Sequence, residues 1–144
     1  MKSILQFTDY HVTDIEYKFD PWGKSDSEYL LPTFSFGLDF ADEEKNKALI
    51  TLGIEMGDPE LEKNFFFVNC EIKGEFCIES DEELTEQEKL DFYKINGVSI
   101  LYPYLRSLIS DVTSKGNETP IILPTMNIAK MIADQEAAAE SAKS

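Results

Sequence analysis

Apolar side chains recur at every second position through the first half of this chain and at helical spacing through the second half. Strict alternation is typical of a β-strand with one buried face, whereas spacings of three and four residues are typical of an amphipathic helix. We therefore predict four strands, over residues 10–19, 34–40, 48–56 and 66–78, followed by helices. Strands in series with helices after them favour an α+β domain built on a four-stranded antiparallel sheet.

The first helix is predicted to follow an acidic connection over residues 79–91. Thr85 and Glu88 have the spacing of a capping box, so the helix should begin near Glu86. The pair Asn96–Gly97 is expected to interrupt it, because glycine and asparagine disfavour helix interiors.

A long helix is then predicted over residues 98–114, with Gly116 as its C-terminal stop. Pro103 is tolerated if it lies in a first turn, but it should kink a helix that runs through from Glu86. Two prolines make residues 117–127 an extended connection.

A second, C-terminal helix is expected over residues 128–139. The length of 144 residues suits one domain with its own core. We expect that domain to span residues 1–139, with residues 140–144 as a flexible tail.

The formal net charge of −15 argues against nucleic acid as a partner, because phosphate binding needs clustered Lys and Arg. No apolar run is long enough to predict insertion into a membrane, and Asp9 follows the start too soon for a signal peptide. Cys70 and Cys77 lie seven residues apart in one predicted strand, on opposite faces, so they should not pair. Together these features indicate a cytoplasmic protein.

Catalytic chemistry is not indicated. His11 is the only histidine, so a multi-histidine metal site is excluded, and a dyad of His11 with Cys70 or Cys77 stays open. The acidic runs lie in connections, and no nucleotide, zinc-protease or serine-hydrolase motif is present. We predict no catalytic residue, no metal and no cofactor.

Some apolar surface is left over after one helical layer covers one sheet face. Phe65 and Phe67 alternate onto the other face, and Tyr102 and Tyr104 flank the stripe of the long helix. Such surface usually marks an interface or a binding groove, so we expect a homo-oligomer. Arg106, the only arginine, is interpreted either as a surface ion pair or as a fork that holds an interface.

The run Ile100-Leu101-Tyr102-Pro103-Tyr104-Leu105-Arg106 continues to Lys115-Gly116 and then to the proline-bearing stretch from Pro120 to Asn127. This pattern resembles the signature helix of the SecB export chaperones. The order of elements is similar to that family over roughly residues 8–140.

The resemblance implies a homotetramer, a dimer of dimers, that holds unfolded clients or preproteins without ATP and docks the motor SecA through acidic residues. Asp14 and Glu71 fall on the family's docking positions. Lys18 stands where the family has another acid, and Asn69 stands where it has a leucine, so this chain departs from the family at that site. Pro103 and Arg106 are expected to be structural or to lie at the oligomer interface.

A groove for the client is the leading functional hypothesis. Two alternatives stay open: a SecB-like scaffold or regulator dedicated to one partner such as an antitoxin, and a small enzyme or ligand-binding protein with a closed pocket that holds His11 or a buried acid. The predicted groove residues, chosen as aromatic side chains suited to adaptable contacts, are Trp22, Phe76, Phe92, Tyr102 and Tyr104.

Overall fold

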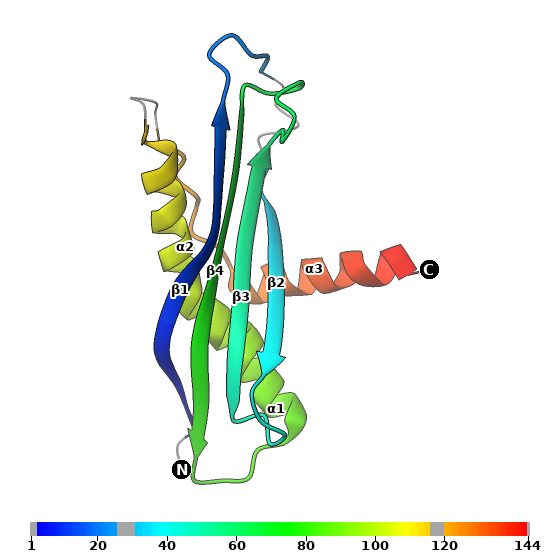
Figure 1. Ribbon diagram of the computed structural model, residues 1–144. Coiled ribbons are helices and arrows are strands. Elements are labelled where there is room, and N and C mark those ends of the chain that lie inside the picture. Colours follow the sequence, from blue (N-terminus) through cyan, green and yellow to red (C-terminus); the bar gives the residue numbers. More distant parts are fainter. Residues whose placement is uncertain (1–2, 26–30, 116–119, 144) are drawn as a thin grey trace.

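A four-stranded antiparallel sheet forms the front layer of the molecule, as the computed structural model shows in Figure 1. The structure describes residues 3–25, 31–115 and 120–143. The predicted α+β class and antiparallel sheet are confirmed. The strands are β1 (Ser3–Phe19), β2 (Thr33–Phe40), β3 (Lys47–Gly57) and β4 (Phe66–Ser80).

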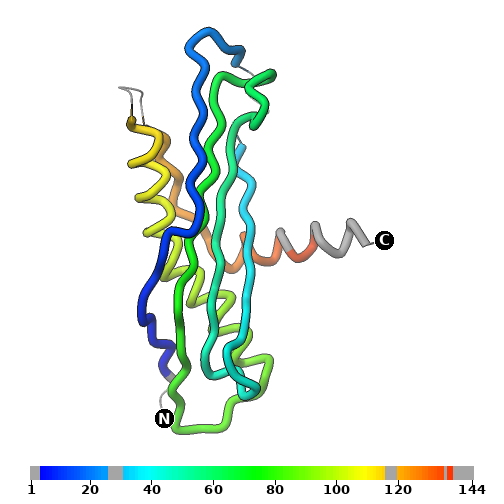
Figure 2. Tube along the Cα trace, in the orientation of Figure 1, coloured from blue at the N-terminus to red at the C-terminus, as the bar shows by residue number. Residues whose placement is uncertain are grey.

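The strand order is β1-β4-β3-β2. β2, β3 and β4 pair with their neighbours in sequence, whereas β1 lies beside β4 and not beside β2 (Figure 2). Three sequential strands with a fourth reached by a long connection make a Greek-key arrangement. β1 and β4 are the two longest strands and pair over 15 registered positions, from Ser3 opposite Ser80 to Phe19 opposite Phe66.

β1 begins at Ser3, earlier than the predicted strand over residues 10–19, and two β-bulges interrupt its alternating pattern. The bulges fall between Phe7 and Asp9 and between Val12 and Asp14. Each adds one residue to β1 without turning the following side chains onto the wrong face. The residues of β1 that share the helix-side face are therefore unevenly spaced: Leu5, Phe7, Tyr10, Val12, Ile15, Tyr17 and Phe19.

The core lies between the sheet and the helix α2 (Val98–Thr113), which crosses behind it (Figure 1). Leu101, Leu105 and Ile109 are fully buried, as their apolar spacing predicts. The residue just before α2, Gly97, lies close to β3, where an added Cβ would lie 2.3 Å from Cδ1 of Ile50.

The helix begins at Glu86, as predicted, with α1 (Glu86–Asp91). Thr85 Oγ1 accepts the N–H of Glu88 at 3.1 Å, and the Glu88 carboxylate accepts the N–H of Thr85 at 3.1 Å. This reciprocal pair is the capping box that the sequence indicates.

The expected interruption at Asn96–Gly97 is wrong. A π-helix, η2 (Phe92–Gly97), carries the chain without a break from α1 into α2. A wider turn accommodates an extra residue while the backbone bonding continues. Pro103 consequently lies inside a continuous helix, and its ring is exposed.

Phe67 was expected to be leftover apolar surface, and the structure corrects this, because its side chain is only 4% exposed. Lys18 extends over it, with Nζ 6.0 Å from the ring centroid and 2.8 Å from the carbonyl oxygen of Pro59, to which it donates. Phe65 is half-buried and packs edge-on against Phe19 at 5.5 Å. Lys18, bonded to the loop after β3, therefore covers Phe67 on the outer face, whereas Phe65, also expected on that face, contacts Phe19 of the inner face.

Asp58 holds that loop in shape. Its carboxylate accepts the N–H groups of Glu60, Glu62 and Lys63 at 2.7–3.0 Å. The bonds from Lys63 and Glu60 hold the pKa of Asp58 below its ordinary value.

Residues 120–127 form the extended connection that the prolines predict, and the expected stop at Gly116 lies outside the described residues. The last helix, α3 (Ile128–Lys143), runs through positions 140–143, where a flexible tail was expected. Its first turns bury Ile128, Met131 and Ile132. Beyond them α3 projects away from the body (Figure 1).

Candidate functional site

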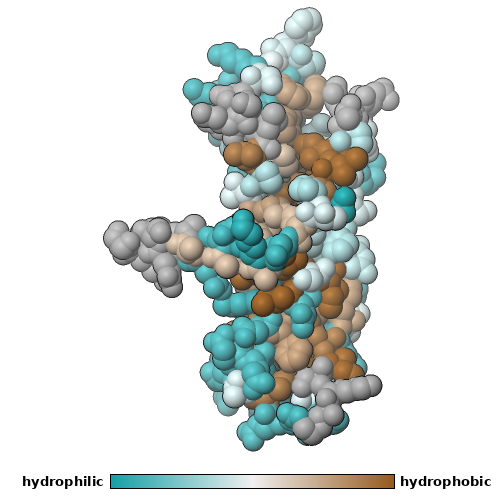
Figure 3. Space-filling model, turned by 180° about the vertical axis from the view of Figure 1, so that it is seen from behind, coloured by the Kyte–Doolittle hydropathy of each residue, from teal (hydrophilic) through white to brown (hydrophobic). Residues whose placement is uncertain are grey.

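An exposed apolar strip follows the side of β1 that faces the helix layer. Val12 and Ile15 are 44% and 50% exposed, although both lie on the inner face of the sheet. Tyr104 of α2 is 40% exposed and packs at a tilt against Tyr10, with ring centroids 4.5 Å apart. We call Val12, Ile15 and Tyr104 the edge strip. Seen from the helix side, hydrophobic residues also gather in patches above and below the point where α3 leaves the body (Figure 3).

The backbone beside the edge strip is unpaired. β1 is the last strand on its side of the sheet, so within the described residues one edge of its 17-residue length has no neighbouring strand. A long edge strand offers its free N–H and C=O groups to another chain. β1 therefore presents both exposed apolar side chains and unpaired backbone N–H and C=O groups at the same edge of the sheet.

Two of the predicted groove residues lie in the core. Phe76 stacks on Phe7 at 5.1 Å, and Tyr102 donates its hydroxyl hydrogen to the carbonyl of Pro124 at 2.6 Å. Both side chains are buried, and burial raises the pKa of Tyr102. Neither is part of an exposed surface in this structure, and Phe92 is half-buried at the start of η2.

Trp22 lies at the far end of β1 and is 94% exposed. Its backbone N–H bonds to the Asp20 carboxylate at 3.0 Å, and the N–H of Asp20 bonds to the carbonyl of Phe65 at 2.7 Å. Strand geometry separates this turn from Tyr104 by about 30 Å, so the five predicted residues do not form one groove.

Asp14 and Glu71, the acids that the resemblance singled out, lie directly opposite each other on the outer face of β1 and β4. Asn69 donates to the Asp14 carboxylate at 2.9 Å. Thr13, the residue added by the second bulge, donates to the Glu71 carboxylate at 2.7 Å. This contact of Thr13 was not predicted from the sequence, because the position of its side chain depends on the bulge.

The two cysteines lie on opposite faces, as predicted, and both are free. Cys70 is in the core, and burial raises its pKa to about 11. Cys77 is half-buried on the outer face and contacts the Gln6 side chain at 3.4 Å. His11 is on the outer face of edge strand β1, so the sheet separates it from Cys70, and no dyad with that thiol forms.

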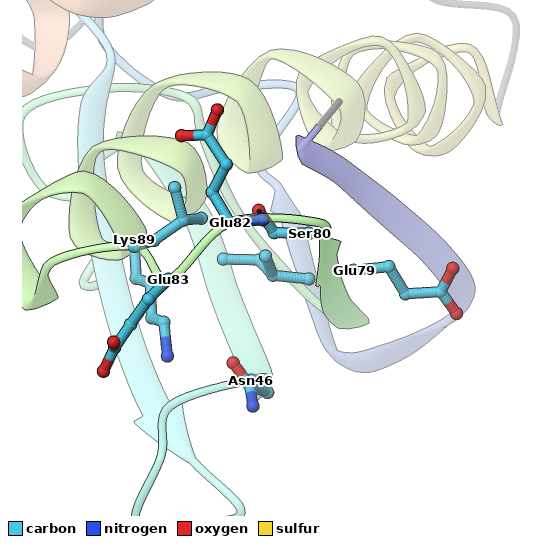
Figure 4. A pocket seen from close by; sticks show the side chains of 8 residues that line it. Asn46, Glu79, Ser80, Glu82, Glu83 and Lys89 are labelled. Carbon is cyan, nitrogen blue, oxygen red and sulfur yellow. Dashed lines mark hydrogen bonds between the residues drawn. The ribbon is translucent and has the colours of Figure 1, made fainter. Parts of the chain in front are cut away.

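The hollow at the end of the sheet, about 430 Å³ in volume, is drawn in Figure 4. The carboxylates of Glu79, Glu82 and Glu83 line it but point away from one another. Lys89, which also lines it, donates to the carbonyl of Glu44 at 2.6 Å. The hollow does not bring two carboxylates together, as acid–base catalysis would require.

Pro103 and Arg106 lie one turn apart on α2, the proline exposed and the arginine half-buried. Among the described residues Arg106 forms no ion pair, so the surface ion pair considered from the sequence is not present. Among the described helices, none combines the length and the hydropathy that a membrane span requires.

The family model "Preprotein translocase subunit SecB" matches residues 28–139 of this chain. An uncharacterized protein of Methanocaldococcus jannaschii is 32% identical over 137 residues, which cover 94% of this chain and 86% of that protein. The protein-export protein SecB of Anaplasma phagocytophilum is 35% identical over 96 residues, 65% of this chain and 60% of that protein. Across the SecB-named relatives compared, the matched part spans 41% to 64% of their length.

A solved structure with a similar fold is the Mycobacterium tuberculosis SecB-like chaperone in complex with a ChAD peptide from the HigA1 antitoxin. The TM-score is 0.61 at 15% sequence identity, over 85% of this chain and 90% of that one. The similarity of the fold thus agrees with the resemblance to the SecB family that the helix motif and the order of the elements indicated from the sequence.

Proposed function

Since the chain belongs to the SecB family, we propose that it is an ATP-independent chaperone that holds non-native polypeptides. The observation that carries this proposal is the edge strip, which stays exposed beside an unpaired strand edge. Unfolded segments present exposed apolar side chains, which are the feature that such a strip of apolar groups binds.

We propose a homotetramer, a dimer of dimers, in which the free edge of β1 pairs with the β1 of a second copy. Pairing uses the backbone groups in the plane of the sheet, whereas Val12 and Ile15 point out of that plane. Two edge strips would then lie side by side and remain open. Such doubling increases the avidity for a client without any sequence specificity.

The acidic pair Asp14 and Glu71 is the proposed contact for SecA or another basic partner. Its support is the cross-strand placement on the outer face, away from the edge strip. Lys18 is bonded to Pro59 and Asn69 to Asp14, so the two departures from the family pattern serve contacts within this chain. Binding of SecA is expected to be weaker than with an acid at position 18.

The test is suppression of the aggregation of a chemically unfolded client at a 1:1 ratio without nucleotide. Ile15→Asp places a charge on the edge strip and is expected to reduce suppression at least about 10-fold, because a carboxylate is costly to desolvate against apolar groups. Ile4→Asp is the matched control: Ile4 lies on the same strand and is 47% exposed, but on the outer face.

The solution mass of both variants separates assembly from binding. A tetrameric Ile15→Asp variant that no longer protects the client supports the edge strip as the client surface. Equal protection by Ile15→Asp and Ile4→Asp would refute that surface, and no protection by the unmodified chain would refute the holdase.

A second candidate is a chaperone dedicated to one partner. It is favoured by the similarly folded Mycobacterium tuberculosis protein, whose structure holds a peptide from an antitoxin. Affinity capture from the cells that make this chain distinguishes the two: one stoichiometric protein indicates a dedicated partner, and a range of preproteins indicates a general holdase.

A further inference from the structure

Asp9, His11 and Glu75 converge on the outer face of the sheet, at the β1–β4 ladder. We propose that these three side chains form a binding site for one divalent transition-metal ion of the zinc type. The proposal is independent of the chaperone function. It departs from the prediction of no metal, because β4 brings Glu75 to His11 from 64 positions along the chain.

The distances between the three side chains suit a tetrahedral metal. His11 Nε2 lies 3.4 Å from Glu75 Oε2 and 3.8 Å from Asp9 Oδ2, and all three ligand atoms lie within 4.8 Å of one another. Zinc–nitrogen and zinc–oxygen bonds of about 2.0–2.1 Å place neighbouring ligands about 3.4 Å apart around a tetrahedron. A movement of the Asp9 carboxylate toward the other two ligands would therefore complete three corners and leave the fourth to water.

The first bulge of β1 creates this arrangement. It comes after Phe7, and it places Asp9 directly opposite Glu75 on the outer face while Tyr10 keeps to the inner face. The N–H of Tyr10 bonds to Asp9 Oδ1 at 2.8 Å, which leaves Oδ2 as the oxygen that faces His11. The site is thus built on two paired strands, and one of its ligands is already oriented.

Charge favours a cation at this point. Asp9 and Glu75 are like charges directly opposite each other, an arrangement that destabilises a strand pair. The charged neighbours of the cluster are Lys73, the registered partner of His11, and Asp39 and Lys47, which line a hollow together with Glu75. An imidazole with two carboxylates selects zinc-like ions over magnesium or calcium, which prefer oxygen alone.

Asp14 and Glu71 provide the matched control. They form a second acidic pair opposite each other on the same face of the same two strands, but Asn69 and Thr13 occupy their carboxylates as donors. Removing a charge from either pair changes the total charge equally. Only the first pair includes an imidazole.

The experiment is a calorimetric titration of zinc chloride into the full chain, made without a histidine tag and stripped of metal with a chelator. We expect one zinc ion per chain in the unmodified protein. His11→Gln and Glu75→Gln should each weaken binding at least about 10-fold, whereas Glu71→Gln should leave it unchanged. Magnesium at the same concentration should not compete.

A nuclear magnetic resonance readout identifies the ligand atom. Because His11 is the only histidine, its ring nitrogen signals should shift on zinc addition at pH 7.5, and the shift should be lost at acidic pH as protons displace the metal. Unchanged ring signals, equal losses in Glu71→Gln and Glu75→Gln, or no saturable binding would each overturn the proposal.

Discussion

β1 and β4 are paired along their whole length, yet their inner-face side chains have opposite fates. Val12 lies opposite Ile72 and Ile15 opposite Cys70. The two residues of β4 are completely buried, whereas the two residues of β1 are about half exposed. The alternating pattern is alike in both strands, so the pattern alone does not decide burial.

The position of α2 decides it. α2 lies on the inner face with Leu101, Leu105 and Ile109 buried against the central strands, and along part of β1 it leaves the inner face open. Toward the start of β1, Tyr104 reaches Phe7 and Tyr10, and cover extends to the edge there. Because one helix does not cover all four strands, the central strands form the stable core, and part of the edge strand stays exposed and free to bind.

The largest effect that tests this comparison is on unfolding free energy. Ile72→Ala is expected to cost about 2–4 kcal/mol, because it leaves a cavity in a packed core. Val12→Ala, directly opposite, should cost about 1 kcal/mol or less, since its side chain is half solvated already. Urea denaturation at matched protein concentration measures both. Equal losses would show that a second copy buries Val12.

The reactivity of a thiol should also differ between β4, where the inner face is buried, and β1, where it is exposed. At pH 8 the raised pKa of Cys70, about 11, lowers its thiolate fraction by more than about 100-fold relative to an ordinary thiol. In a Cys77→Ser background, Cys70 should resist a disulfide reagent until the chain unfolds. Adding Val12→Cys, which lies opposite Ile72 and not opposite a thiol, should introduce one fast-reacting thiol, and a slow reaction at both positions would contradict an open edge.

The comparison extends to two tyrosines on the helix. Tyr93 is completely buried and donates to the carbonyl of Lys45 at 2.8 Å, whereas Tyr104 is on the edge strip. Tyr93→Phe is expected to cost about 1–2 kcal/mol and Tyr104→Phe almost nothing. The measurement is again the free energy of unfolding at neutral pH.

Alkaline pH sharpens this contrast. Burial, with Asp42 as a second cause, raises the pKa of Tyr93 to about 12, while tyrosine in an unfolded chain ionises near 10. Folding therefore favours the neutral phenol, and this stabilisation is complete below pH 10 and is lost as the pH rises from 10 to 12. The Tyr93→Phe variant should not lose unfolding free energy over this pH range. If the variant and the unmodified protein lose stability equally between pH 10 and 12, Tyr93 is not the group responsible.

The smallest expected effect is on the outer face. Thr13→Ala removes an exposed hydrogen bond to Glu71, so the unfolding free energy should change by about 0.5 kcal/mol or less. A loss as large as that of Ile72→Ala would mean that the outer polar contacts, and not the core, hold β1 to the sheet.

The sequence predicted most of what depends on local pattern. Alternation located β2, β3 and β4, the Thr85–Glu88 spacing located the first helix, and the spacing of Cys70 and Cys77 placed them on opposite faces. The Ile100–Arg106 run indicated the family, which the family model confirms. These features need only neighbours in the chain.

What the sequence could not show depends on contacts across the fold. The first bulge of β1 broke the period of two before residue 10, so residues 3–9 of that strand were missed. The burial of Phe67 requires the loop held by Asp58, and the meeting of His11 with Glu75 requires the pairing of β1 with β4. A π-turn also replaced the helix break expected at Asn96–Gly97, and Gly97 lies where the helix packs closely on Ile50 of β3.

Trp22 is the only tryptophan in the chain, and the turn at Asp20 keeps its indole almost entirely in water. Its fluorescence therefore reports on the tip of the sheet and not on the core. Emission from the folded chain should already resemble that of an unfolded one, so heating the protein will shift it little. A blue shift on mixing with a client or a partner would instead indicate contact at that tip. The fluorescence of Trp22 can therefore report binding without an added label.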